Sequence, residues 1–230
     1  MISQNRGSVK YIVAEYDNVF YLIRSDEEGL KMEPIITVEH IRQHVIEDAA
    51  DLISLLGVLD PIITLPRLKE VDDIAHASRL LRKLLSRDLI LIVCRLHEAA
   101  DQKGATGITA SIDSLLDFAA GDIAAERTAE LKAKRKQIIS DLEAQGTKFT
   151  DLRAFRTAEI AHSLHRTSRD SDNSLYYFSV AQFARQTYDL ILEIEQELVL
   201  SGSTAFTDLP DLAEAWQRRG SAIWDRVFNH

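Results

Sequence analysis

The sequence contains a single cysteine and no long apolar run. One cysteine cannot close a disulfide within the chain, and Cys94 lies in the apolar stretch 89–94, so we expect a small buried hydrophobic residue in a reducing compartment. Asp88 and Arg95 bound that stretch, which is far shorter than the roughly 20 residues that a membrane helix requires. Residues 1–7 lack the basic and apolar regions of a secretion signal. The sequence therefore predicts a cytoplasmic protein that does not span a membrane.

Positive charge is also scarce. The chain has 27 Lys and Arg against 36 Asp and Glu, and this net charge of -9 argues against indiscriminate binding to polyanions. Residues 123–169 are the exception, with 10 basic and 6 acidic side chains, whereas the segments on either side are neutral or acidic. Five basic side chains cluster there: Arg127, Lys132, Lys134, Arg135 and Lys136. They could follow RNA phosphates or, because Glu126 and Glu130 interrupt them, form the solvated face of a helix.

The pattern of apolar residues predicts a mainly helical chain. A hydrophobic content of 46% in 230 residues is enough for the core of one domain. Helical periodicity predicts helices at about 38–57, 68–100, 111–121, 122–145, 149–166, 175–200 and 210–228. The helix over 68–100 is expected to be central. Gly57 and the loop at Asp60-Pro61 are expected to end the first helix, and Thr109 or Ser111 to cap the third.

The N-terminal residues follow a different pattern. Residues 9–24 are rich in β-branched and aromatic types around Asp17-Asn18, which favours a hairpin, with a short helix as the alternative. We therefore predict an all-α fold in which an antiparallel helical bundle over residues 37–230 follows a small N-terminal β-hairpin or appendage over residues 1–36.

The most function-like feature is the segment 156–162, which begins with Arg156 and ends with His162. An Arg separated from a His by four to six residues would arise about 1.6 times by chance in a chain of this composition, so the spacing alone says little. The flanking residues say more. Residues 152–155 read Leu-Arg-Ala-Phe, an Ala directly precedes the His, and a polar loop then leads into another amphipathic helix.

Together with the upstream stretches 89–97 and 111–116, these features resemble the HEPN superfamily in its abortive-infection branch, over roughly residues 70–200. HEPN domains are the helical domains of many prokaryotic toxin and abortive-infection RNases. Thr157 stands where that family prefers Asn, Asp or His, and Leu164 stands where members modified by a nucleotidyltransferase antitoxin have Tyr.

The resemblance implies a metal-independent endoribonuclease in a toxin or phage-defence role, with RNA as substrate and no cofactor. It further implies a homodimer with a composite active site, and an antitoxin or other defence partner protein. The residues it assigns to catalysis are Arg156 and His162, with Glu159 supporting them. The residues it assigns to RNA binding are Arg153, His165 and Arg166.

The chemistry of these side chains fits RNA cleavage by transesterification. A histidine, with an ordinary pKa of about 6.5, can take or give a proton at the ribose 2′-OH or at the leaving oxygen. The planar fork of Arg156 can hold the phosphate and its developing charge. On an ideal helix, however, residues 156 and 162 point about 120° apart. Phe155, Glu159, His162 and Arg166 instead form one stripe, which predicts a helix–helix seam and a site shared across a two-fold dimer.

Other readings of the same residues remain open. The chain could be a catalytically inactive HEPN-like scaffold that binds RNA or a protein, and the segment could be an ordinary, partly exposed helix face. Glu159-x-x-His162 also has the spacing of ligands in di-metal helical bundles, and Asp73-x-x-His76 is a similar pair. The sequence lacks a second Glu-x-x-His and evident bridging carboxylates. His40, His44 and Glu47 share one helix face and are more typical of a solvated helix than of a metal site.

Overall fold

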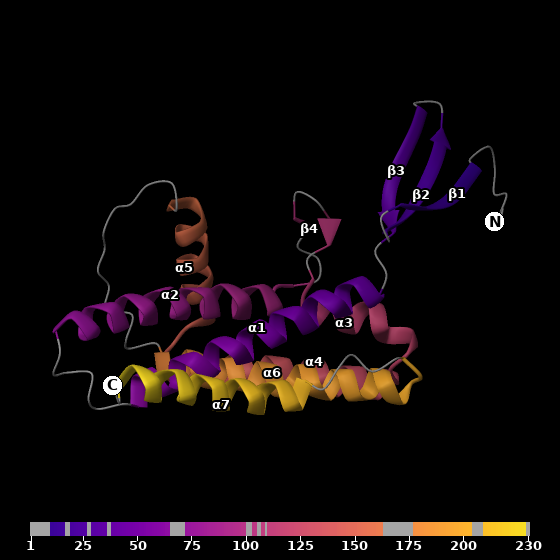
Figure 1. The fold of residues 1–230 in the computed structure, drawn as a ribbon. Helices are drawn as coiled ribbons and strands as arrows, with labels where there is room; N and C mark the ends of the chain where they lie inside the picture. The colour runs from indigo at the N-terminus through magenta and orange to yellow at the C-terminus, as the bar shows by residue number, and fades with distance from the viewer. Residues whose placement is uncertain are drawn as a thin grey trace.

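The computed structural model describes residues 10–16, 19–26, 29–35, 38–64, 72–99, 103–104, 107–108, 110–162, 177–203 and 209–228. A bundle of long helices follows a small N-terminal sheet, so the predicted helical fold class is confirmed (Figure 1). No helix of the described part of the chain is long and apolar enough to cross a membrane.

The N-terminal sheet has three antiparallel strands in the order β1 (Lys10–Tyr16), β2 (Val19–Asp26) and β3 (Gly29–Ile35). The register runs from Lys10 opposite Ser25 to Tyr16 opposite Val19, which confirms the predicted hairpin. The third strand was not predicted, because Pro34 reads as part of an extended link. An edge strand such as β3 can accept a proline, since one side of it needs no hydrogen-bond donors. Two short strands, β4 (Lys103–Gly104) and β5 (Gly107–Ile108), pair within the predicted loop after the second helix.

The helices mostly match the predicted ranges. They are α1 (Val38–Thr64), α2 (Asp72–Leu96), α3 (Ile112–Phe118) with the one-turn helix η2 (Ala119–Gly121), α4 (Ala125–Ala144), α5 (Phe149–His162), α6 (Tyr177–Leu200) and α7 (Leu209–Phe228). Of the two predicted caps of α3, Ser111 is confirmed, because its hydroxyl accepts a hydrogen bond from the Ser114 N–H at 3.2 Å.

The predicted end of the first helix at Gly57 is wrong, because α1 continues through Pro61 to Thr64. Pro61 has no N–H to donate to the carbonyl of Gly57, four residues earlier, so that carbonyl is left without its helical partner. A Cβ on Gly220 of α7 would overlap this carbonyl, and a Cβ on Gly57 would come within 2.9 Å of the backbone of Trp216. The two glycines let the backbones of α1 and α7 touch, and this packing keeps the turn helical against local propensity.

The core is built around α1, rather than around the second helix as periodicity had suggested. α1 packs against α2, α3, α6 and α7, and α6 packs in turn against α2 and α4 (Figure 1). Leu52, Leu56, Leu89, Leu116 and Phe183 are among the fully buried side chains. The arrangement leaves α5 attached mainly to the end of α2, where it stands out from the bundle.

One buried ion pair joins α1 to α6. Arg42, which is 1% exposed, donates from Nε to a carboxylate oxygen of Glu195 at 2.8 Å and from Nη2 to the other oxygen. The bidentate geometry satisfies both oxygens, which is what makes such a pair tolerable in an apolar interior.

Candidate functional site

The helix that carries residues 156–162 is fixed to the bundle at its first turn. Gly146 ends α4 with a φ of 86°, the left-handed conformation that glycine adopts readily, and the N–H of Thr147 reaches back to the carbonyl of Leu142 at 3.3 Å. The buried hydroxyl of Thr147 lies 2.7 Å from that of Ser179 on α6. The chain is therefore anchored to α6 two residues before α5 begins.

A buried histidine lies at the junction of α2, α5 and α6. The ring of His97 stands 4.7 Å from the ring of Phe183 on α6 and 6.0 Å from that of Phe149, the first residue of α5. Its Nε2 atom is 2.8 Å from the hydroxyl of Thr187, which itself donates to the carbonyl of Phe183 at 2.7 Å. Because the only hydroxyl proton of Thr187 is used there, His97 must donate from Nε2. The ring is thus the neutral tautomer with its hydrogen on Nε2.

The surroundings keep this ring uncharged. Burial, with a smaller contribution from the charge of Arg135, lowers the pKa of His97 to about 3. Its other nitrogen, Nδ1, accepts no hydrogen bond from any group in the described ranges. His97 therefore serves as an aromatic and hydrogen-bonding joint, and it is not a proton-transfer group at neutral pH.

Arg135 of α4 supports the same junction. It is 8% exposed, donates from Nη2 to the carbonyl of His97, and pairs through Nη1 with Asp113 of α3 at 2.9 Å. Burial lowers its pKa, and the charge of Asp113 partly opposes that shift. An arginine held in this way ties α3, α4 and the end of α2 together, and it is not available to RNA phosphates.

The residue after His97 holds the candidate arginine. A carboxylate oxygen of Glu98 contacts Nη1 of Arg156 on α5. The Glu98 side chain is 10% exposed and that of Arg156 is 26% exposed, so the pair lies largely inside the protein while part of the guanidinium remains accessible. Contacts with α4, α5 and α6 fix the turn that contains His97 and Glu98. The Glu98 carboxylate therefore holds the Arg156 guanidinium from a fixed position.

A buried thiol lies close to Arg153 and Arg156 of α5. Cys94 is fully buried, which confirms the sequence prediction. Burial raises its pKa to about 11, and the positive charges of Arg156 and Arg153 oppose the shift only in part. The thiol is therefore protonated and unreactive in the folded protein.

The structure describes two of the six predicted site side chains. Arg153 is exposed and Arg156 is partly buried against Glu98. Glu159 and His162 belong to α5 by their backbone, but their side chains lie outside the described set, and His165 and Arg166 lie outside the described residues altogether. The expected contact of Glu159 with the Arg or His thus stays a prediction.

Two neighbours on α5 add detail to the predicted seam. Phe155 is partly buried and packs against the core of its own chain, so the apolar stripe begins as an intramolecular contact. The Thr157 hydroxyl donates to the carbonyl of Arg153 at 3.0 Å. A threonine that bonds back along its own helix at an exposed position has no part in holding Arg156.

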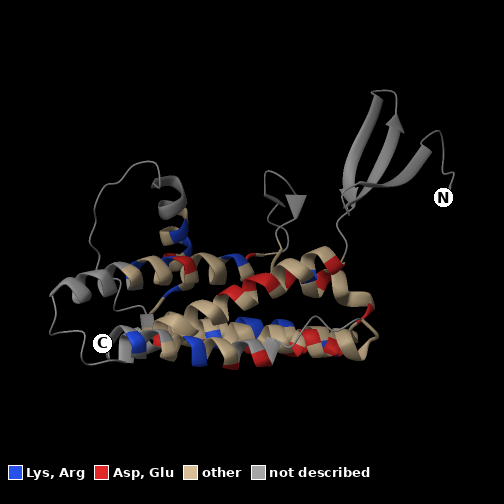
Figure 2. Ribbon diagram, in the orientation of Figure 1, with Lys and Arg blue, Asp and Glu red and all other residues tan. Residues whose placement is uncertain are grey.

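The basic cluster of α4 is largely neutralised by its neighbours. Arg127 pairs with Glu193 and Glu197 of α6 at 2.8 and 2.7 Å, and Lys134 also contacts Glu193. Lys132 pairs with an aspartate of α3. Basic and acidic residues both occur in this layer of helices (Figure 2). The cluster therefore fits the solvated-face interpretation better than an RNA-binding track.

No group of three or more His, Cys, Asp or Glu that could hold a metal ion occurs among the described residues. His44 and Glu47, two members of the trio on α1, form an exposed pair at 3.3 Å. The side chains of Asp73, His76, Glu159 and His162 fall outside the description, so the Glu-x-x-His hypothesis is not examined by the structure.

No family model matches the chain, and neither the curated proteins nor the solved structures contain a significant match. The case for a function therefore depends on the residues themselves.

Sequence reasoning missed His97 and Glu98, which are the two residues that organise the site. The upstream stretch 89–97 belongs to the family resemblance and includes His97, but no role is predicted for that histidine, and the stretch ends one residue before Glu98. A carboxylate at the end of an apolar helix was the available signal, but nothing local to it indicates an arginine 58 positions later in the chain.

Proposed function

We propose that this chain is a metal-independent endoribonuclease of HEPN type with Arg156 and His162 at its active site, in a toxin or phage-defence role. The observation that supports the proposal is the fixed and partly accessible guanidinium of Arg156, held by Glu98 where α5 leaves the bundle. A cation held by a carboxylate of the protein is oriented before substrate binds, and orientation in advance is the main requirement for stabilising charge that develops on a phosphate.

The reaction divides between the two side chains. His162 removes the proton of a ribose 2′-OH, whose oxygen attacks the adjacent phosphorus to form a 2′,3′-cyclic phosphate. The bond from phosphorus to the 5′-oxygen of the next nucleotide breaks, and that oxygen takes the proton from the imidazolium of His162. Arg156 binds the non-bridging phosphate oxygens through the donors that Glu98 does not occupy. Glu159 supports the pair, and Arg153, which is exposed, contacts the RNA together with His165 and Arg166.

A second copy of the chain completes this site. Residues 156 and 162 are about 120° apart around one helix, so a single α5 aims the two side chains in different directions. A two-fold axis that pairs two copies of α5 brings the Arg of one copy to the His of the other. The site then forms at the helix that stands out from the bundle, which leaves it free to meet its symmetry mate (Figure 1).

The second candidate function is a catalytically inactive scaffold that binds RNA or a protein partner. The ion pair with Glu98 favours it, because the carboxylate already neutralises Arg156, and the paired charges along α4 leave little free positive surface there. Under this second proposal the ion pair between Glu98 and Arg156 has a structural role only, which is to hold α5 against the bundle.

An RNA cleavage assay separates the two candidates. Purified protein is incubated with single-stranded RNA in EDTA, beside Arg156→Ala, His162→Ala and the control Arg218→Ala, which removes an exposed arginine of α7. The nuclease proposal predicts cleavage by the wild type and the control and a loss of at least about 100-fold in the two site variants. If all four proteins leave the RNA equally intact, or cleave it equally, the nuclease proposal is wrong.

A further inference from the structure

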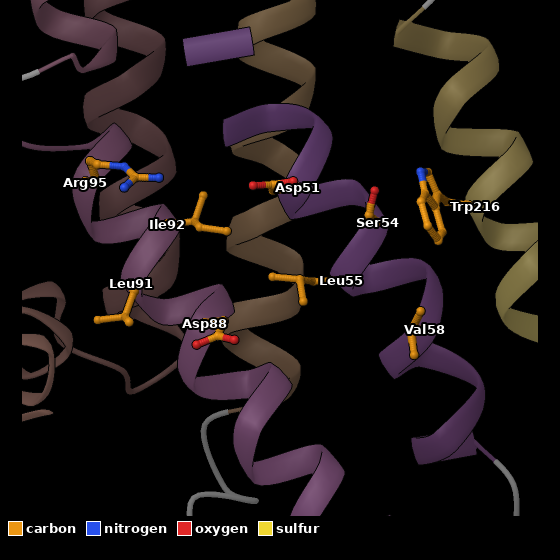
Figure 3. Close-up of a pocket in the computed structure, with 9 residues that line it drawn as sticks. All are labelled: Asp51, Ser54, Leu55, Val58, Asp88, Leu91, Ile92, Arg95 and Trp216. Atoms are coloured by element: carbon orange, nitrogen blue, oxygen red, sulfur yellow. The ribbon is translucent and has the colours of Figure 1, made fainter. Parts of the chain in front are cut away.

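A groove with a volume of about 510 Å³ lies over α1, between α2 and α7 (Figure 3). It is separate from the α5 site and is of the size of small-molecule pockets. Its apolar lining includes Leu55 of α1, Leu91 and Ile92 of α2, and Trp216 of α7. Leu55 and Leu91 are partly exposed in it, so the groove offers apolar contact area to a ligand.

Two carboxylates stand at diagonally opposite ends of this apolar floor. Asp51 and Asp88 both line the groove, and Figure 3 shows Leu55 and Ile92 between them. The side chain of Asp88 is 53% exposed, with Arg87 at a long 3.8 Å. Asp51 is exposed and forms no ion pair with the residues that the structure describes.

The register of the two helices gives the spacing of these carboxylates. The pair between Asp48 of α1 and Arg95 of α2, with Nε 2.6 Å from a carboxylate oxygen, sets positions 48 and 95 opposite each other. Because the helices are antiparallel, Asp51 then faces Ile92, and Asp88 faces the turn that contains Leu55. The offset along the axis is about four residues, or about 6 Å, and with the distance between the helix axes the two carboxylates are roughly 10 Å apart.

Among the residues that the structure describes, Arg95 is the one cation that lines the groove, and it is already paired. Arg95 donates through two nitrogens to the buried carboxylate of Asp48, so it closes one end of the groove without adding net positive charge. The nearby charge of Asp51 is one of the causes that raise the pKa of Asp48, after burial, which is the largest. A cation placed at Asp51 would relieve that repulsion.

We propose that this groove binds a linear aliphatic polyamine. One terminal ammonium pairs with Asp51, the other with Asp88, and the methylene chain lies on Leu55 and Ile92. The Ser54 hydroxyl donates to the carbonyl of Ala50 at 2.7 Å, so its oxygen is left to accept a hydrogen bond from an ammonium. Trp216 already carries the guanidinium of Arg219 over its ring, 5.5 Å from the centroid, so it contributes apolar surface to the groove and is not assigned an ammonium of the ligand. A flat anionic patch would bind any cation, whereas this arrangement selects two charges at a set spacing.

Titration calorimetry with three probes tests the proposal. The probes are spermidine, 1,7-diaminoheptane and 1-aminoheptane, and the proteins are the wild type, Asp51→Asn, Asp88→Asn, the double variant and the control Asp122→Asn. Asp122 is exposed near the start of α4, outside the groove, so its substitution changes the net charge equally. Both groove carboxylates are exposed, and circular dichroism checks that each variant keeps the wild-type helix content.

The expected pattern is specific to two-ended binding. Spermidine and the diamine bind the wild type and Asp122→Asn equally, each single groove variant loses about threefold to fivefold in affinity, and the double variant loses about tenfold or more. The monoamine binds the wild type about as weakly as the diamine binds either single groove variant, because in both cases one ammonium–carboxylate pair is lost. No measurable binding to the wild type, equal loss in Asp122→Asn, or equal affinity for monoamine and diamine would each overturn the proposal.

Discussion

Acidification should destabilise this protein through His97, because that ring is neutral in the folded state and free to take a proton when the chain unfolds. Burial lowers its pKa from 6.5 to about 3. Between those two values the unfolded chain binds one more proton than the folded chain. The stabilisation from keeping the ring neutral is therefore fully present above pH 6.5 and is lost progressively as the pH falls toward 3.

The magnitude follows from the size of the shift. Each unit of pH within that window costs about 1.4 kcal/mol of unfolding free energy, so lowering the pH from 7.5 to 5 should cost roughly 2 kcal/mol through this ring alone. Because single domains are commonly stable by about 5–15 kcal/mol, that loss is easily measured.

Urea unfolding followed by circular dichroism provides the assay. Glutamine at position 97 does not titrate in this range and keeps a donor for Thr187. The His97→Gln variant should therefore be less stable than the wild type at neutral pH, and it should lack the part of the acid-dependent loss of stability that His97 causes. The matched control is His44→Gln, which replaces an exposed histidine of α1 and should keep the wild-type pH dependence. The reasoning is refuted if the wild type and His97→Gln lose stability in parallel between pH 7.5 and 5.

Three further outcomes are expected elsewhere in the fold. Gly220→Ala places a methyl group on the carbonyl of Gly57, and thermal unfolding should show a loss of about 2–3 kcal/mol, whereas an unchanged midpoint would mean that α1 and α7 do not touch there. Arg42→Met leaves the carboxylate of Glu195 buried without its partner and should cost about 3–5 kcal/mol in urea unfolding, while the double replacement of both residues by Met should restore most of it. Cys94 should react with a thiol reagent only at the rate of unfolding, and rapid labelling of the native protein would contradict its burial.

The sequence predicts the helices well because their signals are local. Apolar periodicity and a capping serine depend on residues within a few positions of one another, and the start of α3 after Ser111 follows from them directly. The prediction of where α1 ends is wrong because the deciding contact is not local. Gly57 and Pro61 carry strong helix-breaking signals, and the packing of α1 on α7, in which Gly57 touches Gly220, 163 residues later, overrides them.

The candidate site shows the same limit. The segment 156–162 is visible in the sequence, but its spacing is close to what chance gives, and the residue that holds its arginine lies on another helix. The pattern along one helix predicts Glu159 as a supporting carboxylate, which stays a prediction. The structure adds Glu98, from another part of the chain, as a carboxylate that contacts Arg156. His97 contacts the rings of Phe149 and Phe183 and so fixes the turn that carries Glu98. No local sequence pattern links that turn to the guanidinium of Arg156.

A mixing experiment tests most directly the claim that two chains share one active site. Arg156→Ala and His162→Ala, each inactive alone, are mixed, allowed to exchange subunits and assayed on RNA in EDTA. If the site takes its arginine from one copy and its histidine from the other, half of the dimers are mixed and each regains one of two sites, so about a quarter of the wild-type activity should return. If the mixture stays as inactive as its components while the wild type cleaves RNA, the shared site is contradicted.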